Sequence, residues 1–303
     1  MDTKPPAATP TTASPTATSP AAALRCRTVL VPLDGSPLAE RALLTAGWLA
    51  RHLEAELHVV AADITRSELW WYQRYLDELV EERPEVTAHR SNDPDVARTV
   101  HDLAGQLGPT VVCLATHGRA RGAGLLGSTF SAIAAAGTSP LVAVGARARP
   151  FGPGDVPDRI VACVDGTETS TAILPEAAAW ARRLGMSLTV VTVVEPAPRP
   201  WVPHAHRQRA FGPQGDPDEC VRSLVGRPEL AGLDVDGLVL WDPIGPDVAL
   251  FEHLERRPAT LLALTSHART GVARVVLGSE AARIVHGSPL PVLVRPIGVD
   301  AQR

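Results

Sequence analysis

The chain has 303 residues, of which 45% are hydrophobic, and this apolar content is sufficient for two ordinary cores. Its formal net charge of -4 provides no overall attraction for a phosphate backbone, so we expect no nucleic acid among its partners. The four cysteines form no CxxC pair, and Cys113 and Cys163 lie in apolar runs. This cysteine usage suits a reducing compartment and predicts a cytoplasmic protein.

Two segments differ in composition from the rest of the chain. Residues 1–24 consist mainly of Pro, Thr, Ser and Ala, which predicts a disordered tail and not a secretory signal. Residues 122–146 carry no charge, but they hold several Gly, Ser and Thr together with Pro140. We therefore expect no membrane-spanning helix and no membrane partner.

From residue 28 onward, β-branched runs alternate with helical periodicity. The predicted strands of the first half are Thr28–Leu33, Glu56–Ala62, Val86–His89, Thr110–Ala115 and Leu141–Gly145, and the predicted helices are Pro37–Leu53, Asp95–Gln106 and Ser128–Ala136. A further helix carries an aromatic stripe between Leu69 and Leu79. We expect that stripe to pack on its own sheet, the alternative being a face that binds a partner.

The second half repeats the first. Val29–Ser36 matches Ile160–Thr167 without a gap, and Ala115–Arg119 matches Thr265–Arg269. The predicted strands are Arg159–Val164, Ser187–Val193, Gly237–Trp241, Thr260–Leu264 and Val292–Arg295, and the predicted helices are Pro175–Leu184, Asp218–Leu230, Asp247–Arg256 and Ser279–His286.

Strands that alternate with helices through short connections predict an α/β fold with two doubly wound, Rossmann-like parallel-sheet domains in tandem. The predicted boundaries are a tail at 1–24, a first domain at 25–148, a Pro- and Gly-rich linker at 149–158, a second domain at 159–297 and a tail at 298–303.

Ligands of such sheets bind beyond the carboxyl ends of the strands, where the strand order reverses. Three loops of each copy meet there. The first holds Asp34 or Asp165, the second follows Val60 or Val191, and the third leads into the helix that starts with Ser128 or Ser279. A helix N-terminus offers backbone N–H groups to phosphates. Each acid could instead close an Asx turn, and each serine could be a plain helix cap.

These motifs resemble those of the universal stress protein family, and the resemblance extends from Thr28 to Pro296. It rests on the duplicated Asp-Gly-Ser/Thr loop, the His-Gly/Ala-Arg loop and the proline before each last strand. Members that bind ATP have a glycine, two residues, a second glycine, nine residues, and then Gly with Ser or Thr. The first copy has Ala115 and Gly118 at the early glycines, with a loop one residue shorter. The second copy has Thr265 and Ala268 there and keeps the spacing to Gly278.

The resemblance implies binding of ATP or a related adenine nucleotide, with or without Mg²⁺, by a sensor or regulatory module of the stress response. In the first copy the implied binding residues are Asp34, Val60, Ala61, Ala115, His117, Gly118, Arg119, Gly127, Ser128 and Thr129. In the second they are Asp165, Val191, Thr192, His267, Ala268, Arg269, Gly278 and Ser279. We expect the first copy to be the better site, since it keeps Gly118. The histidines are interpreted as structural or phosphate-adjacent.

No catalytic residue and no metal ligand is predicted. Two alternatives stay open: an interaction protein of the same fold that has lost ATP binding, and a slow ATPase. The family also pairs its domains through the last strand of each sheet. Leu141–Gly145 and Val292–Arg295 could therefore join the two domains of one chain like a dimer, or join two chains as a homodimer.

Overall fold

The structure is a computed structural model, and it describes residues 24–62, 69–117, 126–136, 139–156, 158–194, 216–242, 245–256, 260–266 and 277–296. The first copy comprises β1 (Thr28–Pro32), α1 (Pro37–Leu53), β2 (Glu56–Ala61), α2 (Leu69–Glu82), β3 (Val86–Arg90), α3 (Val96–Leu107), β4 (Thr110–Ala115), α4 (Ser128–Ala136) and β5 (Leu141–Val144). The second comprises β6 (Arg159–Cys163), α5 (Glu168–Thr171), α6 (Ile173–Leu184), β7 (Ser187–Val194), α7 (Pro217–Val225), η2 (Pro228–Leu230), β8 (Val235–Trp241), α8 (Pro246–Glu255), β9 (Thr260–Ser266), α9 (Ser279–Gly287) and β10 (Val292–Pro296).

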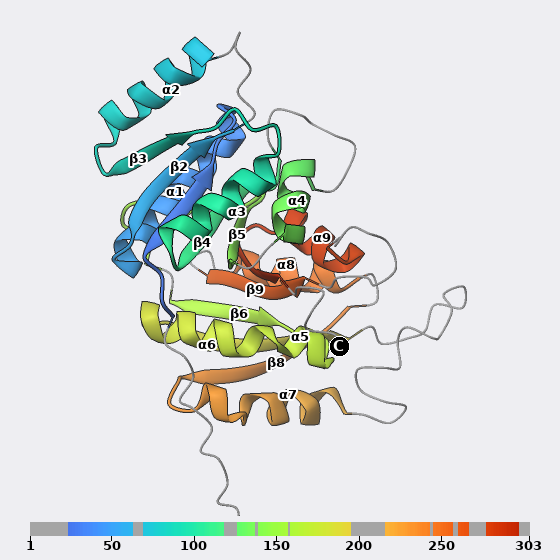
Figure 1. Cartoon of the computed structure of the whole chain (residues 1–303). Coiled ribbons are helices and arrows are strands. Elements are labelled where there is room, and N and C mark those ends of the chain that lie inside the picture. Colours follow the sequence, from blue (N-terminus) through green and yellow to red (C-terminus); the bar gives the residue numbers. More distant parts are fainter. Residues whose placement is uncertain are drawn as a thin grey trace, which may run out of the picture.

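The described strands form one sheet with the order β3-β2-β1-β4-β5-β10-β9-β6-β7-β8 (Figure 1). Within each copy the pairing is parallel, as predicted, and the strand order reverses between β1 and β4 and between β6 and β9. The two last strands, β5 and β10, pair antiparallel within the chain, with Val142 opposite Leu293. The strands of the two copies therefore run in opposite directions, and their carboxyl ends lie at opposite ends of the strands.

Helices cover both faces of this sheet, because successive strand residues point to opposite sides. Val29 and Val31 pack on one side with α1, α2, α6 and α7, while Leu30 packs on the other side with α3, α4, α8 and α9. Each core layer runs through both copies. The chain thus forms two parallel-sheet domains that share one continuous sheet.

Two helices differ from the predicted bounds by more than one residue, and proline and glycine explain both differences. α7 ends at Val225 instead of Leu230, because Gly226 and Pro228 interrupt it and only a short 3₁₀ turn follows. α6 begins at Ile173, upstream of the predicted start at Pro175. Proline is accommodated there because the first-turn N–H groups need no helical partner.

The aromatic stripe of α2 packs on its own domain, which confirms the prediction. Tyr72, Leu76 and Leu79 are buried, whereas Trp70 is exposed. The hydroxyl of Tyr72 donates a hydrogen bond to the backbone oxygen of Asp34 (3.2 Å). α2 therefore supports the turn after β1.

The segment between the copies packs against α1. Phe151 is buried, its amide donates to Thr45 Oγ1 (3.1 Å), and its ring lies 5.1 Å from that of Trp48. The indole N–H of Trp48 donates to the backbone oxygen of Asp155 (2.8 Å). This segment is therefore part of the packed structure of the first domain.

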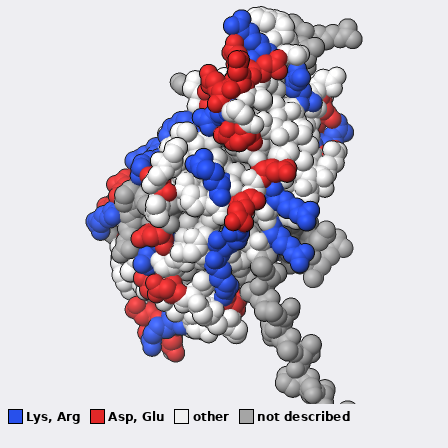
Figure 2. Space-filling model, turned by 90° about the vertical axis from the view of Figure 1, so that its left-hand side faces the viewer, with Lys and Arg blue, Asp and Glu red and all other residues white. Residues whose placement is uncertain are grey.

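Basic and acidic side chains are interspersed over the face shown in Figure 2, without a broad field of one sign. Within the described ranges, no helix combines the length and apolar character that crossing a membrane requires.

Candidate functional site

The loop between β4 and α4 closes on itself at the carboxyl end of β4. Thr116 is fully buried, and its amide continues the sheet by donating to Val144 O (3.1 Å). The chain returns at Gly127, whose amide donates to Thr116 O (2.8 Å). Residues 118–125, which include the predicted Gly118 and Arg119, lie outside the described part. A Cβ on Gly127 would lie 3.1 Å from Thr116 O and 3.4 Å from His117 Cα, so this closure leaves little space for a side chain.

The closed loop places the N-terminus of α4 at the point where the strand order reverses. α4 begins at Ser128, as predicted, and Ser128 and Thr129 are exposed. Its first turn contains no acidic residue. Because the first N–H groups of a helix have no intrahelical acceptor, this end favours an anion. The Gly127 amide itself is occupied by Thr116, so it is not one of the groups that an anion would meet.

The turn after β1 holds Asp34 as an Asx turn. Asp34 Oδ1 accepts from the Ser36 amide (3.0 Å), and Gly35 has a positive φ of 70°. Ser36 then caps α1 by accepting from Ala39 N (3.2 Å). These bonds account for the acid without a ligand, so the structural alternative that the sequence left open is realised.

The residues predicted near the base are buried. Val60 and Ala61 are at most 1% exposed, one in each core layer, and their carbonyls accept from Leu33 N and Ser91 N. Their side chains therefore contribute to the two core layers, and residues 63–68, which follow β2, lie outside the described part.

The second copy has a similar acid turn but more polar groups buried in its strands. Asp165 Oδ1 accepts from both the amide and the hydroxyl of Thr167, at 3.0 and 2.6 Å. Val191 and Thr192 are fully buried, and Thr192 donates to Val164 O (2.7 Å). Thr265 points inward and donates to Ser170 O (3.2 Å), so its hydroxyl serves the fold.

α9 differs from α4 in the charge of its first turn. Gly278 is the N-cap without a side-chain cap bond, Ser279 follows it, and Glu280 stands where α4 has Thr129. Burial, and after it the charges of Asp165 and Glu280, raise the pKa of the Cys163 thiol to about 12. The two carboxylates thus act on the same end of β6. Binding of an anion at the N-terminus of α9 is therefore less favourable than at the N-terminus of α4.

His117, the last described residue before the β4–α4 loop, meets a residue of the second copy. Its ring lies edge to face with that of His286, with centroids 5.2 Å apart and planes at 70°. Nδ1 of His117 is also 3.2 Å from Thr116 Oγ1. In the second copy His267, Ala268 and Arg269 lie outside the described residues. Sequence reasoning missed the roles of Glu280 and His286, although aligning Gly278–Ser279 with Gly127–Ser128 would have set them opposite Thr129 and Ala135.

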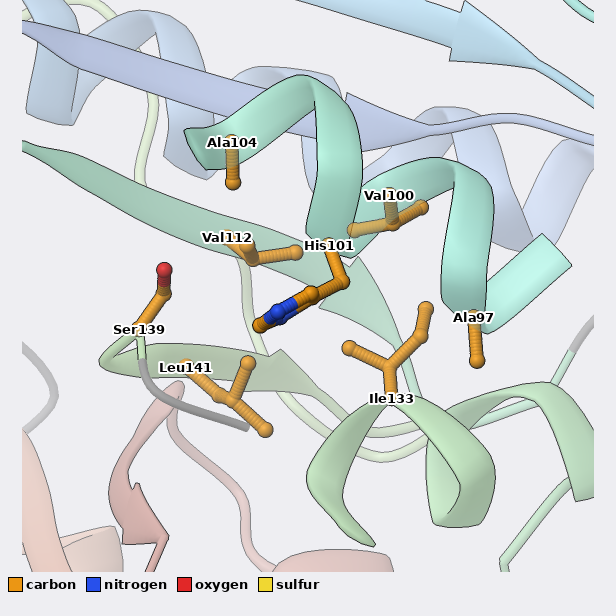
Figure 3. A pocket seen from close by; sticks show the side chains of 8 residues that line it. All are labelled: Ala97, Val100, His101, Ala104, Val112, Ile133, Ser139 and Leu141. Carbon is orange, nitrogen blue, oxygen red and sulfur yellow. The ribbon is translucent and has the colours of Figure 1, made fainter. Parts of the chain in front are cut away.

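The described residues also line two hollows. A pocket of about 10 Å³ between α3 and α4 is lined mainly by apolar side chains, with His101 and Ser139 as its polar members (Figure 3). It adjoins the amino-terminal parts of β4 and β5, and it is the size of one water. A groove of about 490 Å³ opens between α1 and α2, with Leu43, Leu79 and several charged residues along it.

Comparison with known proteins agrees with the duplicated fold. A family model described as the universal stress protein family matches twice, at residues 26–145 and 157–296. Among solved structures, a universal stress protein from Archaeoglobus fulgidus is 19% identical, covers 88% of this chain and 97% of its own, and has a TM-score of 0.59. A functionally unknown protein (16% identical, TM-score 0.54) and a putative universal stress protein (17%, 0.52), both from Pseudomonas aeruginosa, each cover 89% of this chain and 92% of their own. Among curated proteins, no sequence matches the chain.

Proposed function

The chain belongs to the universal stress protein family, and from this premise we propose that it binds ATP or a related adenine nucleotide through its first copy and acts as a regulatory module of the stress response. The observation that carries the proposal is the α4 N-terminus. It lies at the strand-order reversal, has no acidic residue in its first turn, and follows the closure at Gly127, which leaves little space for a side chain.

The residues of the first copy fit the phosphates of a nucleotide. The backbone N–H groups at the start of α4 and the hydroxyls of Ser128 and Thr129 are hydrogen-bond donors on an exposed surface. Gly118, Arg119 and His117 belong to the loop that would surround the phosphates. If Mg²⁺ accompanies the nucleotide, it would neutralise part of the phosphate charge.

The second copy fits an anion less well. Glu280 places a carboxylate in the first turn of α9, where a phosphate would otherwise interact with the helix dipole. Thr265 and Ala268 also replace the early glycines. We therefore propose one strong site in the chain and a weak second site.

We propose that the nucleotide is bound as a signal and is not consumed in a dedicated reaction. In the first copy, the acid in the loop after β1 is Asp34, which is engaged in its own turn. Positioning a water for phosphoryl transfer requires an oriented base and charge stabilisation together. A slow ATPase remains the enzymatic alternative, and an interaction protein without nucleotide is the alternative from another class.

Purification followed by analysis of bound nucleotide tests the proposal. Denaturation of the purified protein should release an adenine nucleotide. Nucleotide-free protein should bind ATP in calorimetry with about one tight site per chain. A nucleotide-free sample that shows no heat with ATP or ADP, although folded, would favour the interaction-protein alternative. Release of phosphate over hours would favour the ATPase.

A further inference from the structure

The second copy reaches the candidate site of the first through the end of α9. A Cβ on Gly145, just after β5, would come within 3.1 Å of the backbone oxygens of Val285 and His286, so the last turn of α9 lies directly on this strand end. The Arg149 amide donates to Pro289 O (2.8 Å), which ties the segment after β5 to the chain after α9. The end of α9 is therefore held in one place relative to β5.

From this place, the imidazole of His286 contacts that of His117 edge to face. β5 links the two, because Thr116 N donates to Val144 O one residue before Gly145. His117 is the point from which the chain enters the β4–α4 loop. A side chain of the second copy thus packs against the start of the loop that we propose to bind phosphates.

His286 is not the residue that stability alone would select at this position. Its Nδ1 is buried, and within the described part of the chain no group forms a hydrogen bond with it. A buried polar atom without a partner is destabilising. An apolar ring would fill the same space without that penalty.

We propose that His286 is a positioning residue that the second copy supplies to the first: it holds the His117 imidazole and thereby the start of the β4–α4 loop, so that nucleotide binding at the first site depends on the docked second copy. This inference rests on the proposed function. The dependence has one direction, since α4 carries Ala135 at the position that corresponds to His286. The site of the second copy therefore receives no equivalent imidazole.

Calorimetric titration of the full chain with ATP tests this role in three variants. His286→Ala should weaken the tight site at least fivefold. His286→Phe keeps a ring against His117 and removes the buried nitrogen, so it should restore affinity to within twofold of wild type and melt no lower. Arg283→Ala, an exposed change on the same helix, should bind as wild type does. Wild-type affinity in His286→Ala, or loss in all three variants, would overturn the proposal.

A second measurement separates this inference from the proposed function. The imidazole carbon-bound proton signals of His117 in the NMR spectrum, recorded without nucleotide, should shift in His286→Ala and not in Arg283→Ala. If they do not shift, the contact is absent in solution and the inference fails even when ATP binds. If wild-type protein binds no ATP while the signals do shift, the proposed function is the part that fails.

Discussion

The amide of Gly127 donates a hydrogen bond to the carbonyl of Thr116 over 2.8 Å, and this bond closes the loop that precedes α4. Gly127→Val should abolish nucleotide binding at the first site, because its Cβ would press on backbone atoms at 3.1 and 3.4 Å that have little freedom to move. Overpacking of this kind costs about 1–3 kcal/mol of unfolding free energy. Calorimetry with ATP and urea denaturation measure the two effects.

Gly105→Ala is the matched control for that variant. A Cβ at Gly105, inside α3, would meet no atom within 4 Å, so the change should stabilise the helix by about 0.5–1 kcal/mol and leave binding intact. A folded Gly127→Val protein that binds ATP with wild-type affinity would show that the loop closure is not part of the nucleotide site.

Phe151→Ala tests whether packing of the segment between the copies stabilises the first domain. Phe151 is buried against Trp48, and removal of such a side chain typically costs about 3–5 kcal/mol. The nearby Val156→Ala, at a position 77% exposed, should change the unfolding free energy by less than about 0.5 kcal/mol. Equal, small effects of both variants in urea denaturation would show that the segment does not depend on this packing.

The histidine pair between β2 and the edge strand β3 predicts a loss of stability in acid. His58 Nδ1 and His89 Nε2 are 2.8 Å apart, and Glu56 Oε2 lies 3.1 Å from His58 Nε2. Burial, and after it the charge of His58, hold the pKa of His89 below its ordinary value of 6.5. As the pH falls below about 6.5, the unfolded chain therefore takes up this proton before the folded chain does, and the free energy of unfolding decreases.

His89→Gln should flatten this decrease, since an amide can keep the hydrogen bond to His58 and does not titrate. Urea denaturation at pH 7.5 and at pH 5.5 measures the slope. His101→Gln makes the same substitution at an exposed position on α3 and serves as the control. A slope in His89→Gln as steep as in wild type would assign the acid sensitivity to other groups.

Local signals were strong enough to predict most elements of the sheet and the helices around it. Ser36 and Pro37 mark the start of α1, and its end at Leu53 follows from the apolar period, so both bounds were predicted correctly. α7 was predicted too long because a helical pattern was extended across Gly226 and Pro228. Glycine and proline at a helix end therefore outweigh the helical periodicity of apolar residues.

The candidate site was predictable only where its geometry depends on residues that are neighbours in the sequence. The turns at Asp34 and Asp165 are local, and the sequence already contained the Asx alternative that the structure shows. The contact between His117 and His286 depends on the antiparallel pairing of β5 with β10. No local pattern encodes that contact, because it joins residues of different domains.

Exchanging the first-turn residues of α4 and α9 tests the proposed asymmetry between the copies. Thr129→Glu places a carboxylate where Glu280 stands in the second copy, and a charge at a helix N-terminus changes the free energy of a bound anion by about 0.3–1 kcal/mol. We therefore expect Thr129→Glu to weaken ATP binding at the first site by about 2- to 5-fold, and Glu280→Thr to strengthen the second site by a similar factor. Both residues are exposed, so the folded state should be retained and the effect should shrink at high salt. Calorimetry at low and at high ionic strength measures both factors. Two equal sites in the wild-type chain, or a Glu280→Thr variant whose second site does not change, would show that the first-turn charge does not set the difference between the copies.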